Sequence, residues 1–411
     1  MENILTMGAN EREKLKVMHQ LQQGKISRTG AAGCLSISER HVYRLYARYR
    51  KDGDESVIHG LRGTHSNRGY PLKIRAAALE LFVKRYSDYG PTLFGEMLQK
   101  EHDIFVAPET LRRWLLAKNL WTLHRKARPH RKRRERRAAI GSLIQFDGSE
   151  HAWFEDRGPR CTLLVAIDDA SSRSMLKFVE SESTQPVMSF WMEYLQRYGI
   201  PQEIYTDFAS VYCNTQNPDR LTDFGLALQT LGVRHIHAHS PQAKGRVERS
   251  NRTFQDRLLK ALRREGISSI SEANQYLQNG FLTEHNAHFA HCDHLEDIHR
   301  PCAYSELELR NILCQSSTRS VYNDATITLD AQWIQLERSM APVPPPRSHV
   351  ILRRWLDGSL HIFWHNDEIA FTVLQKKPPY KPKPYVRGSQ AHPWRGSMKL
   401  IGKARTIAKV R

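Results

Sequence analysis

The sequence lacks long hydrophobic runs, has few cysteines and shows no excess of acidic residues. Residues Cys161–Ile167 form one of its longer apolar runs, well below the roughly 18 residues that a membrane-spanning helix needs. The amino-terminal residues have neither the apolar core nor the cleavage site of a secretory signal. Six cysteines among 411 residues, without a CxxC pair, are typical of reduced thiols. These absences predict a cytoplasmic protein, with no role in a membrane.

The positive charge is concentrated in two places. The formal net charge is +19, and the whole excess lies in residues 124–137 and 376–411. Such clusters are typical of nucleic-acid binding, and solubilising segments are the alternative. A membrane-surface role is disfavoured because neither stretch has an amphipathic apolar face. The sequence also lacks a GxxxxGK[ST] phosphate loop, so we expect no nucleotide cofactor.

Residues 11–50 have the pattern of three short helices. Ser27 and Ser38 can cap the second and third helices by accepting a backbone hydrogen bond. The third helix has an inward apolar stripe and an outer basic face, as in a helix-turn-helix, whose second helix enters the major groove of DNA. A generic three-helix bundle with a charged surface is the alternative. The candidate DNA contacts are Arg40, His41, Arg44 and Arg48.

Changes of pattern along the chain predict a multidomain α/β protein. Helical stripes are followed by apolar or alternating runs that predict a mixed sheet with helices packed on it, and then by short strands that predict a small β-barrel. The basic linker supplies four more candidate DNA contacts, Arg131, Lys132, Arg133 and Arg134. The expected segments are a helix-turn-helix domain (1–62), a second, winged helix-turn-helix-like domain (63–122), the basic linker (123–140), the sheet domain (141–305), the barrel (306–375) and a basic disordered tail (376–411).

Three carboxylates lie where the predicted sheet and helices can bring them together. Asp147 ends the strand IQFDG, Asp207 ends EIYTDF, and Glu248 lies near the start of a long helix. A sheet fixes the direction of side chains at its strand ends, so two strands can aim their carboxylates at one point. Oxygen ligands of this kind suit Mg²⁺. Two ions about 3.5–4 Å apart can support phosphoryl transfer.

The segments around these acids resemble the DDE transposases and retroviral-type integrases, and most closely the ISNCY group of bacterial insertion-sequence transposases. The resemblance spans residues 12–301 and is strongest in IQFDGSEHAWFEDRGP, YTDFASVY and SPQAKGRVERSNRTFQDRL. It implies an RNase H-like catalytic core in which Asp147, Asp207 and Glu248 form a catalytic, metal-binding triad with two Mg²⁺ or Mn²⁺ ions. It further implies cleavage of double-stranded DNA at the terminal repeats of an element and strand transfer into target DNA. Because two ends must be joined, we expect at least a homodimer on DNA.

Two features depart from that family. Asp207 is followed by Phe208-Ala209 where the family usually has Asn-Gly, and the spacing to Glu248 is longer than is common. Residues 213–223 are a candidate loop insertion that accounts for the longer spacing. Lys244 and Asn251 share the helical face of Glu248 and are further candidate DNA contacts, with a solvated face as the alternative.

Other signals favour structural roles. Asp168 and Asp169 follow a strand and are interpreted as turn-forming residues. Residues 285–302 hold five histidines and two cysteines, but without the paired spacing of a zinc site. The alternative function is a catalytically inactive, transposase-derived DNA-binding regulator, against which the intact acidic set speaks. A nuclease acting on RNA–DNA hybrids is disfavoured, because helix-turn-helix units suit the major groove of B-form DNA.

Overall fold

The chain divides into two compact units, residues 1–126 and 127–411. The computed structural model describes residues 5–60, 62, 69–122, 135–217, 219–238, 245–337 and 343–376. The predicted tail and most of the predicted linker therefore lie outside the described residues. Among the helices that are described, none combines the length and the hydropathy needed to cross a membrane.

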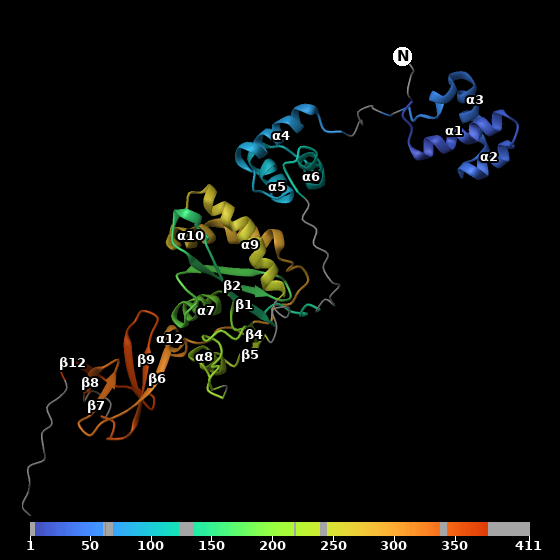
Figure 1. Ribbon diagram of the computed structural model, residues 1–411. Helices are drawn as coiled ribbons and strands as arrows, with labels where there is room; N and C mark the ends of the chain where they lie inside the picture. Colours follow the sequence, from blue (N-terminus) through green and yellow to red (C-terminus); the bar gives the residue numbers. More distant parts are fainter. Residues whose placement is uncertain are drawn as a thin grey trace, which may run out of the picture. The chain divides into compact units, whose positions relative to one another are not determined.

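The first unit contains two helical modules, each with its own hydrophobic core (Figure 1). Ser27 accepts a hydrogen bond from the Gly30 amide at 3.0 Å, and Ser38 accepts one from the His41 amide at 3.3 Å, so both predicted caps are confirmed. Within residues 69–122 there is no strand, so this described stretch has helices but no wing. The first module comprises α1 (Ala9–Gln22), α2 (Arg28–Leu35) and α3 (Glu39–Asp52), and the second comprises α4 (Leu72–Arg85), α5 (Pro91–His102) and α6 (Pro108–Ala117).

The second unit contains the sheet domain, which has a five-stranded mixed sheet with the order β3-β2-β1-β4-β5. The pairs β1–β2 and β2–β3 are antiparallel, whereas β4 is parallel to both β1 and β5. This arrangement confirms the predicted mixed sheet. The strands are β1 (Ile144–His151), β2 (Cys161–Asp168), β3 (Ser174–Val179), β4 (Glu203–Thr206) and β5 (Arg234–His237).

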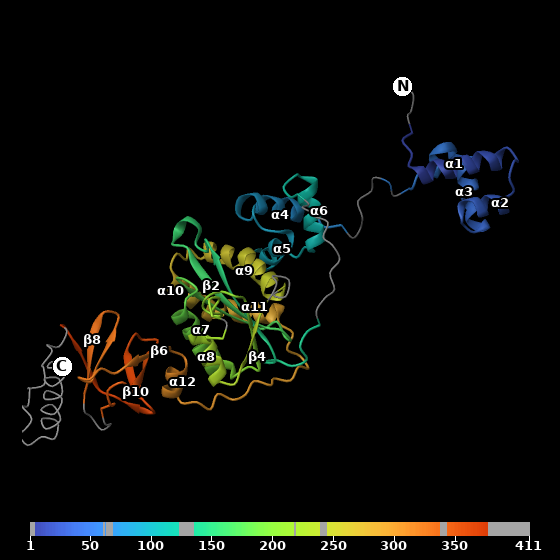
Figure 2. The same ribbon diagram turned by 60° about the horizontal axis from the view of Figure 1, so that its bottom comes forward.

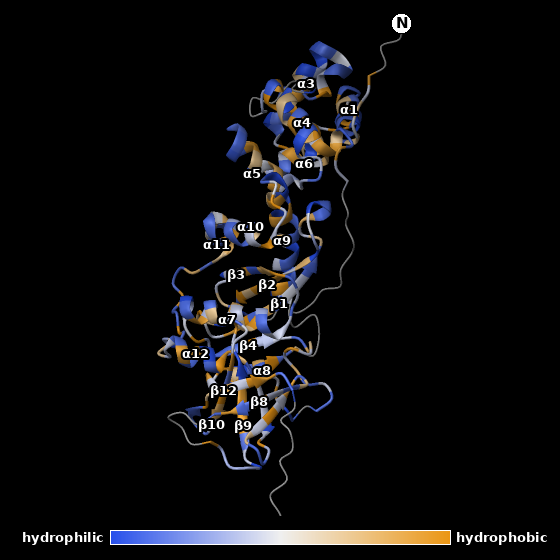
Figure 3. Cartoon of the chain, turned by 90° about the vertical axis from the view of Figure 1, so that its left-hand side faces the viewer, coloured by the Kyte–Doolittle hydropathy of each residue, from blue (hydrophilic) through white to orange (hydrophobic). Residues whose placement is uncertain are grey.

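Helices cover both faces of the sheet (Figure 2). The strand β2 is buried along its whole length, because apolar side chains on both of its faces pack against helices, and Figure 3 shows it in hydrophobic colours. One face packs against α7 and α8, and the other against α9, α10 and α11. These helices are α7 (Thr184–Tyr198), α8 (Asp223–Thr230), α9 (Gly245–Arg264), α10 (Ile270–Tyr276) and α11 (Leu282–Phe289).

The C-terminal module contains two open sheets around one core, not the predicted closed barrel. The strands follow the orders β11-β10-β9-β6 and β12-β8-β7, and among the described residues no ladder joins the two sheets. Asp357-Gly358 lies in a hairpin turn, because β9 and β10 pair on either side of Gly358, which has a φ of 83°. The strands are β6 (Gln315–Ser320), β7 (Thr326–Leu329), β8 (Gln332–Leu336), β9 (His349–Arg354), β10 (Leu360–Trp364), β11 (Asp367–Glu368) and β12 (Phe371–Leu374).

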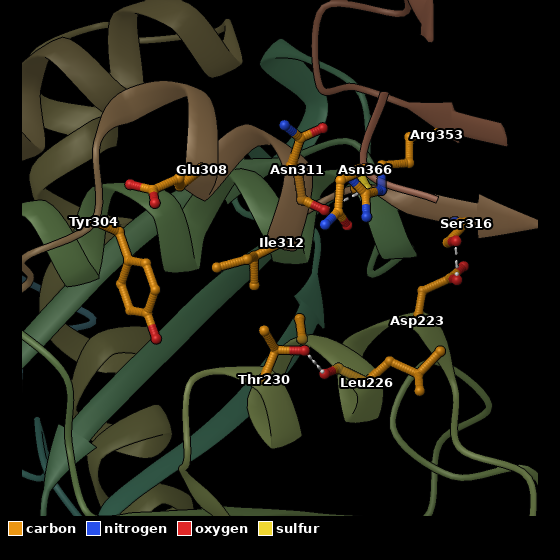
Figure 4. A pocket seen from close by; sticks show the side chains of 12 residues that line it. Asp223, Leu226, Thr230, Tyr304, Glu308, Asn311, Ile312, Ser316, Arg353 and Asn366 are labelled. Carbon is orange, nitrogen blue, oxygen red and sulfur yellow. Dashed lines mark hydrogen bonds between the residues drawn. The ribbon is translucent and has the colours of Figure 1, made fainter. Parts of the chain in front are cut away.

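The helix α12 (Glu306–Ile312) joins this module to the sheet domain. Its buried residue Leu309, and Leu313 directly after it, belong to the core of α7 and α8. Beside it lies a cleft of about 640 Å³ between α8, α12 and the strands β6 and β9, whose lining side chains are drawn in Figure 4. The Ser316 amide donates a hydrogen bond to Asp223 across this junction at 3.0 Å. The module is therefore attached to the sheet domain by both apolar and polar contacts.

A glycine substitution tests how tightly the end of α7 packs against the backbone of Arg300. Gly199 ends α7 with φ 94° and ψ −170°, a region that is essentially restricted to glycine. A Cβ atom there would lie 2.6 Å from the Arg300 carbonyl oxygen. Gly199→Ala should therefore lower the free energy of unfolding in urea by about 2 kcal/mol or more. At Gly245 a Cβ atom meets nothing within 4 Å, so Gly245→Ala is the matched control, and equal losses in both variants would contradict this account.

Candidate functional site

The site is built on the polar side of β1. The residues Ile144 and Phe146 are buried in the core beneath α7 and α8, so Gln145, Asp147 and Ser149 point to the opposite face, toward α9. This alternation is visible in the sequence IQFDGS. A line of polar groups therefore runs along the central strand of the sheet, under a helix.

The helix α9 follows this line in register. The Val247 amide donates to Gln145 at 3.3 Å, the Asn251 amide group donates to Asp147 at 2.9 Å, and the Gln255 amide group donates to Ser149 at 3.3 Å. Four residues of a helix rise about 6 Å, and two residues of a strand rise about 6.6 Å. Each turn of α9 is therefore matched to one polar residue of β1.

Asp147 lies on β1, and Asp207 directly follows β4, the parallel strand next to β1. Ile144 pairs with Ile204, and both Asp147 and Asp207 follow three residues later. Residues in register on parallel strands point to the same face, and such strands lie about 4.8 Å apart. The Asp207 carboxylate is also held by the Ala209 amide, which donates to it at 2.9 Å. Continuing the register of β1 and β4 by two residues therefore puts Asp207 opposite Asp147, on the side of the sheet that faces α9.

Glu248 lies on the flank of α9 that faces β4. Successive helical residues turn by about 100°, and Arg246 pairs with Asp169, which directly follows β2. Glu248 therefore points away from β2 and toward the β4 side, where Asp207 lies. The three acids are nevertheless not gathered here, because among the described residues no three His, Cys, Asp or Glu side chains are placed to hold one metal ion. The oxygen donors and the aligned aspartates fit a divalent cation, and Glu248 would complete the set only by approaching them.

Asn251 contacts an acid of the site. Its side chain is 9 % exposed, and its amide nitrogen donates to the Asp147 carboxylate. Its Oδ1 atom is buried and has no hydrogen-bond partner among the described residues. Such an atom is costly to bury unpaired, so the Asn251 side chain is poised to accept a further donor or cation.

The two aspartates after β2 have structural roles, as predicted for a turn. Asp168 accepts hydrogen bonds from the Gly141 amide at 2.8 Å and from the Ser171 amide and hydroxyl at 2.7 Å. Asp169 is fully buried, accepts from Gln145 at 2.7 Å and pairs with Arg246. Asp169 thus ties the first turn of α9 to the sheet through Arg246, which lies two residues before Glu248.

Sequence reasoning missed Glu182 and Tyr212. The Tyr212 hydroxyl donates to the Glu182 carboxylate, and a Cβ atom on Gly148 would lie 2.1 Å from that carboxylate. Burial, and then the negative charge of Glu182, raise the pKa of Tyr212 well above its usual value, with further contributions from Asp207 and Asp147. Glu182 therefore lies against the strand that carries Asp147. No spacing in the sequence indicates this contact, and the glycine after Asp147 is its one local sign.

The candidate DNA contacts of the first module have the predicted exposure. Arg40, His41, Arg44 and Arg48 are all exposed, while Val42, Leu45 and Tyr49 on the other side of α3 are buried. Five further candidates, Arg131, Lys132, Arg133, Arg134 and Lys244, lie outside the described residues. In the histidine-rich segment, His285 is buried and packs against Phe254 and Phe289.

Comparisons with known proteins agree with these features. Residues 9–58 match the family described as a homeodomain-like domain. "Putative transposase y4bF" of Sinorhizobium fredii is 36% identical over 379 residues, which are 91% of this chain and 83% of that protein. "Transposase for insertion sequence IS1202" of Streptococcus pneumoniae is 28% identical over 442 residues, covering 94% and 93% of the two chains.

Solved integrase structures give weaker matches. The HTLV-2 integrase catalytic core domain in complex with magnesium matches with 18% identity and a TM-score of 0.28, over 34% of this chain and 86% of that chain. The simian T-cell lymphotropic virus intasome matches with 14% identity and a TM-score of 0.32, over 73% and 100% of the two chains.

The anchoring role of Asp169 can be tested by removing its charge. In Asp169→Asn the half-buried Arg246 guanidinium loses its ion pair with a fully buried carboxylate, so the free energy of unfolding in urea should fall by about 3 kcal/mol. Asp219→Asn makes the same change at an exposed loop residue and should leave the free energy of unfolding nearly unchanged. An Asp169→Asn variant as stable as the control would show that Asp169 does not anchor α9.

Proposed function

This chain belongs to the transposases, and we propose that its sheet domain is an RNase H-like catalytic domain of the DDE type. It would cut DNA at the terminal inverted repeats of an insertion sequence and join the freed ends to target DNA. The observation that carries this proposal is the register of the parallel strands β1 and β4, which, continued to the residue after β4, puts Asp207 opposite Asp147, with α9 carrying Glu248 over the same face. The sequence resemblance assigns the catalytic role to these same three residues.

Asp147, Asp207 and Glu248 would hold Mg²⁺ or Mn²⁺, two ions in each active site. When bound, such ions activate the attacking oxygen and stabilise the leaving oxygen of a phosphodiester. The chain's own contribution is orientation, since the Ala209 amide holds Asp207 and the Asn251 amide group holds Asp147. Glu248 would move toward the aspartates when cations are bound, because the cations would then neutralise the combined negative charge of the three carboxylates.

The helical modules and basic segments would position the DNA. The helix α3 presents exposed basic residues and would enter the major groove of a terminal repeat. The basic linker would follow the phosphates, and the C-terminal module and tail would bind target or flanking DNA without strong sequence preference. Because two element ends must be joined, the working assembly would contain at least two copies of this chain.

One observation favours the alternative of an inactive, transposase-derived regulator. The three acids do not form a metal-binding cluster among the described residues. Such a regulator would bind the element ends but leave their strands intact. Because the two functions share DNA binding and differ in chemistry, strand cleavage separates them.

Substitution of the acids tests the catalytic proposal. Asp147→Asn, Asp207→Asn and Glu248→Gln should each reduce Mn²⁺-dependent cleavage and strand transfer on element-end DNA by about 10³-fold or more. Each change removes a charge that holds the ions, and DNA affinity in EDTA should be unchanged. The exposed residues Asp219 and Glu265 allow matched controls, Asp219→Asn and Glu265→Gln, which should keep full activity. A wild-type protein that binds end DNA but releases no 3′-hydroxyl would establish the regulator instead.

The role of α3 can be tested by removing one exposed arginine. Arg44→Ala should weaken binding to a duplex taken from the DNA flanking the reading frame by about 1–3 kcal/mol, and reduce the preference over unrelated DNA. Arg12→Ala removes an exposed arginine from α1 of the same module and should have little effect. Fluorescence anisotropy measures both affinities, and equal losses in the two variants would rule out specific recognition by α3.

A further inference from the structure

A second cleft lies on the flank of α9 opposite Glu248. It has a volume of about 200 Å³ and is bounded by Arg136 of the basic linker, by the end of β2 and the start of β3, by α9 and by α11. Its lining includes three arginines and several hydroxyl groups, among them Arg136, Arg246, Arg249, Ser172, Ser250 and Thr253. We propose that this cleft binds a backbone phosphate of DNA.

Among the described residues, two of the three guanidinium groups have no acidic partner. Arg246 pairs with the buried Asp169. Arg136 donates to the Ala170 carbonyl oxygen and to the Ser172 hydroxyl, each at 2.8 Å, and is exposed. Neither Arg136 nor the exposed Arg249 has an ion pair with a carboxylate in the described parts of the chain. The cleft therefore has a net positive charge.

The other lining groups favour a phosphate. Guanidinium groups match the geometry of phosphate oxygens, and the Ser250 hydroxyl offers a further donor within the same wall. Burial lowers the pKa of His285, which also lines the cleft, to about 4, so this ring is neutral near pH 7 and adds no charge. The positive charge of the cleft thus comes from arginines, which stay protonated at all working pH values.

The position of the cleft favours DNA over a free anion. Residues 124–137 hold nine lysines and arginines, and Arg136 stands at the end of that run. The cleft therefore contains a residue of the strongly basic stretch of the sequence. Since Glu248 and Arg249 are consecutive on α9, a phosphate held in the cleft would fix the duplex against the helix that carries the candidate catalytic acid. This inference rests on the proposed function only in taking DNA as the ligand.

Binding of a labelled duplex without element ends tests the cleft, using the full chain in EDTA over a salt series. Arg249→Gln should lower the affinity and reduce the slope of log K against log salt by about 1, as expected for one lost phosphate contact. Ser250→Asp places a carboxylate in the cleft and should have a similar or larger effect. Arg264→Gln removes the same charge from the last turn of α9, where Arg264 pairs with Glu265, and should leave the slope unchanged.

Each outcome decides the proposal. Unchanged affinity and slope in both cleft variants, with thermal melting showing that they fold, would overturn it. A cleft that binds free phosphate and not DNA would also overturn the proposal. In that case inorganic phosphate would raise the melting temperature of the wild type but not of Arg249→Gln, and the two proteins would bind DNA with equal affinity. Because EDTA removes the chemistry, weaker binding by the cleft variants would support the cleft even if the acidic residues proved inactive.

Discussion

The match between α9 and the central strand β1 is the constraint on which the rest of the site depends. A helix and a strand rarely remain in register, but here three successive turns of α9 meet three polar residues of β1. These contacts set the height of the helix over the sheet and its rotation about its own axis. They therefore decide that Asn251 contacts Asp147, that Glu248 lies on the β4 side, and that Arg246 lies on the β2 side, where it pairs with Asp169.

Buried polar groups around the site hold this arrangement. Asp169 anchors the start of α9 through Arg246 and reaches β1 through Gln145. On the other side, Glu182 and Tyr212 link the segment after β3 to the loop after Asp207. Such groups are costly to bury unless paired, so each tolerates few alternative positions. These buried groups therefore fix the orientation of the acids of the site. The negatively charged acids repel one another, and a bound cation would relieve that repulsion.

Local signals in the sequence predicted much of this structure. The capping serines, the alternation in β1 and the apolar run of β2 each depend on neighbours along the chain, so they could be recognised. The strand β6 has no such local signal, because its sequence, QSSTRS, lacks apolar alternation and becomes a strand by pairing with β9. The C-terminal strands were predicted to form a barrel, but the pattern of strands in a sequence does not determine whether a sheet closes into a barrel. The contact of Glu182 with Gly148 joins distant residues, and no motif indicates it.

The most direct test of the account is to locate bound manganese by anomalous diffraction in a crystal of the full chain with element-end DNA. The account predicts manganese bonded to the carboxylates of Asp147 and Asp207, with Glu248 in the same coordination shell. Manganese bound elsewhere, or a Glu248 side chain that stays apart from the loaded aspartates, would contradict it.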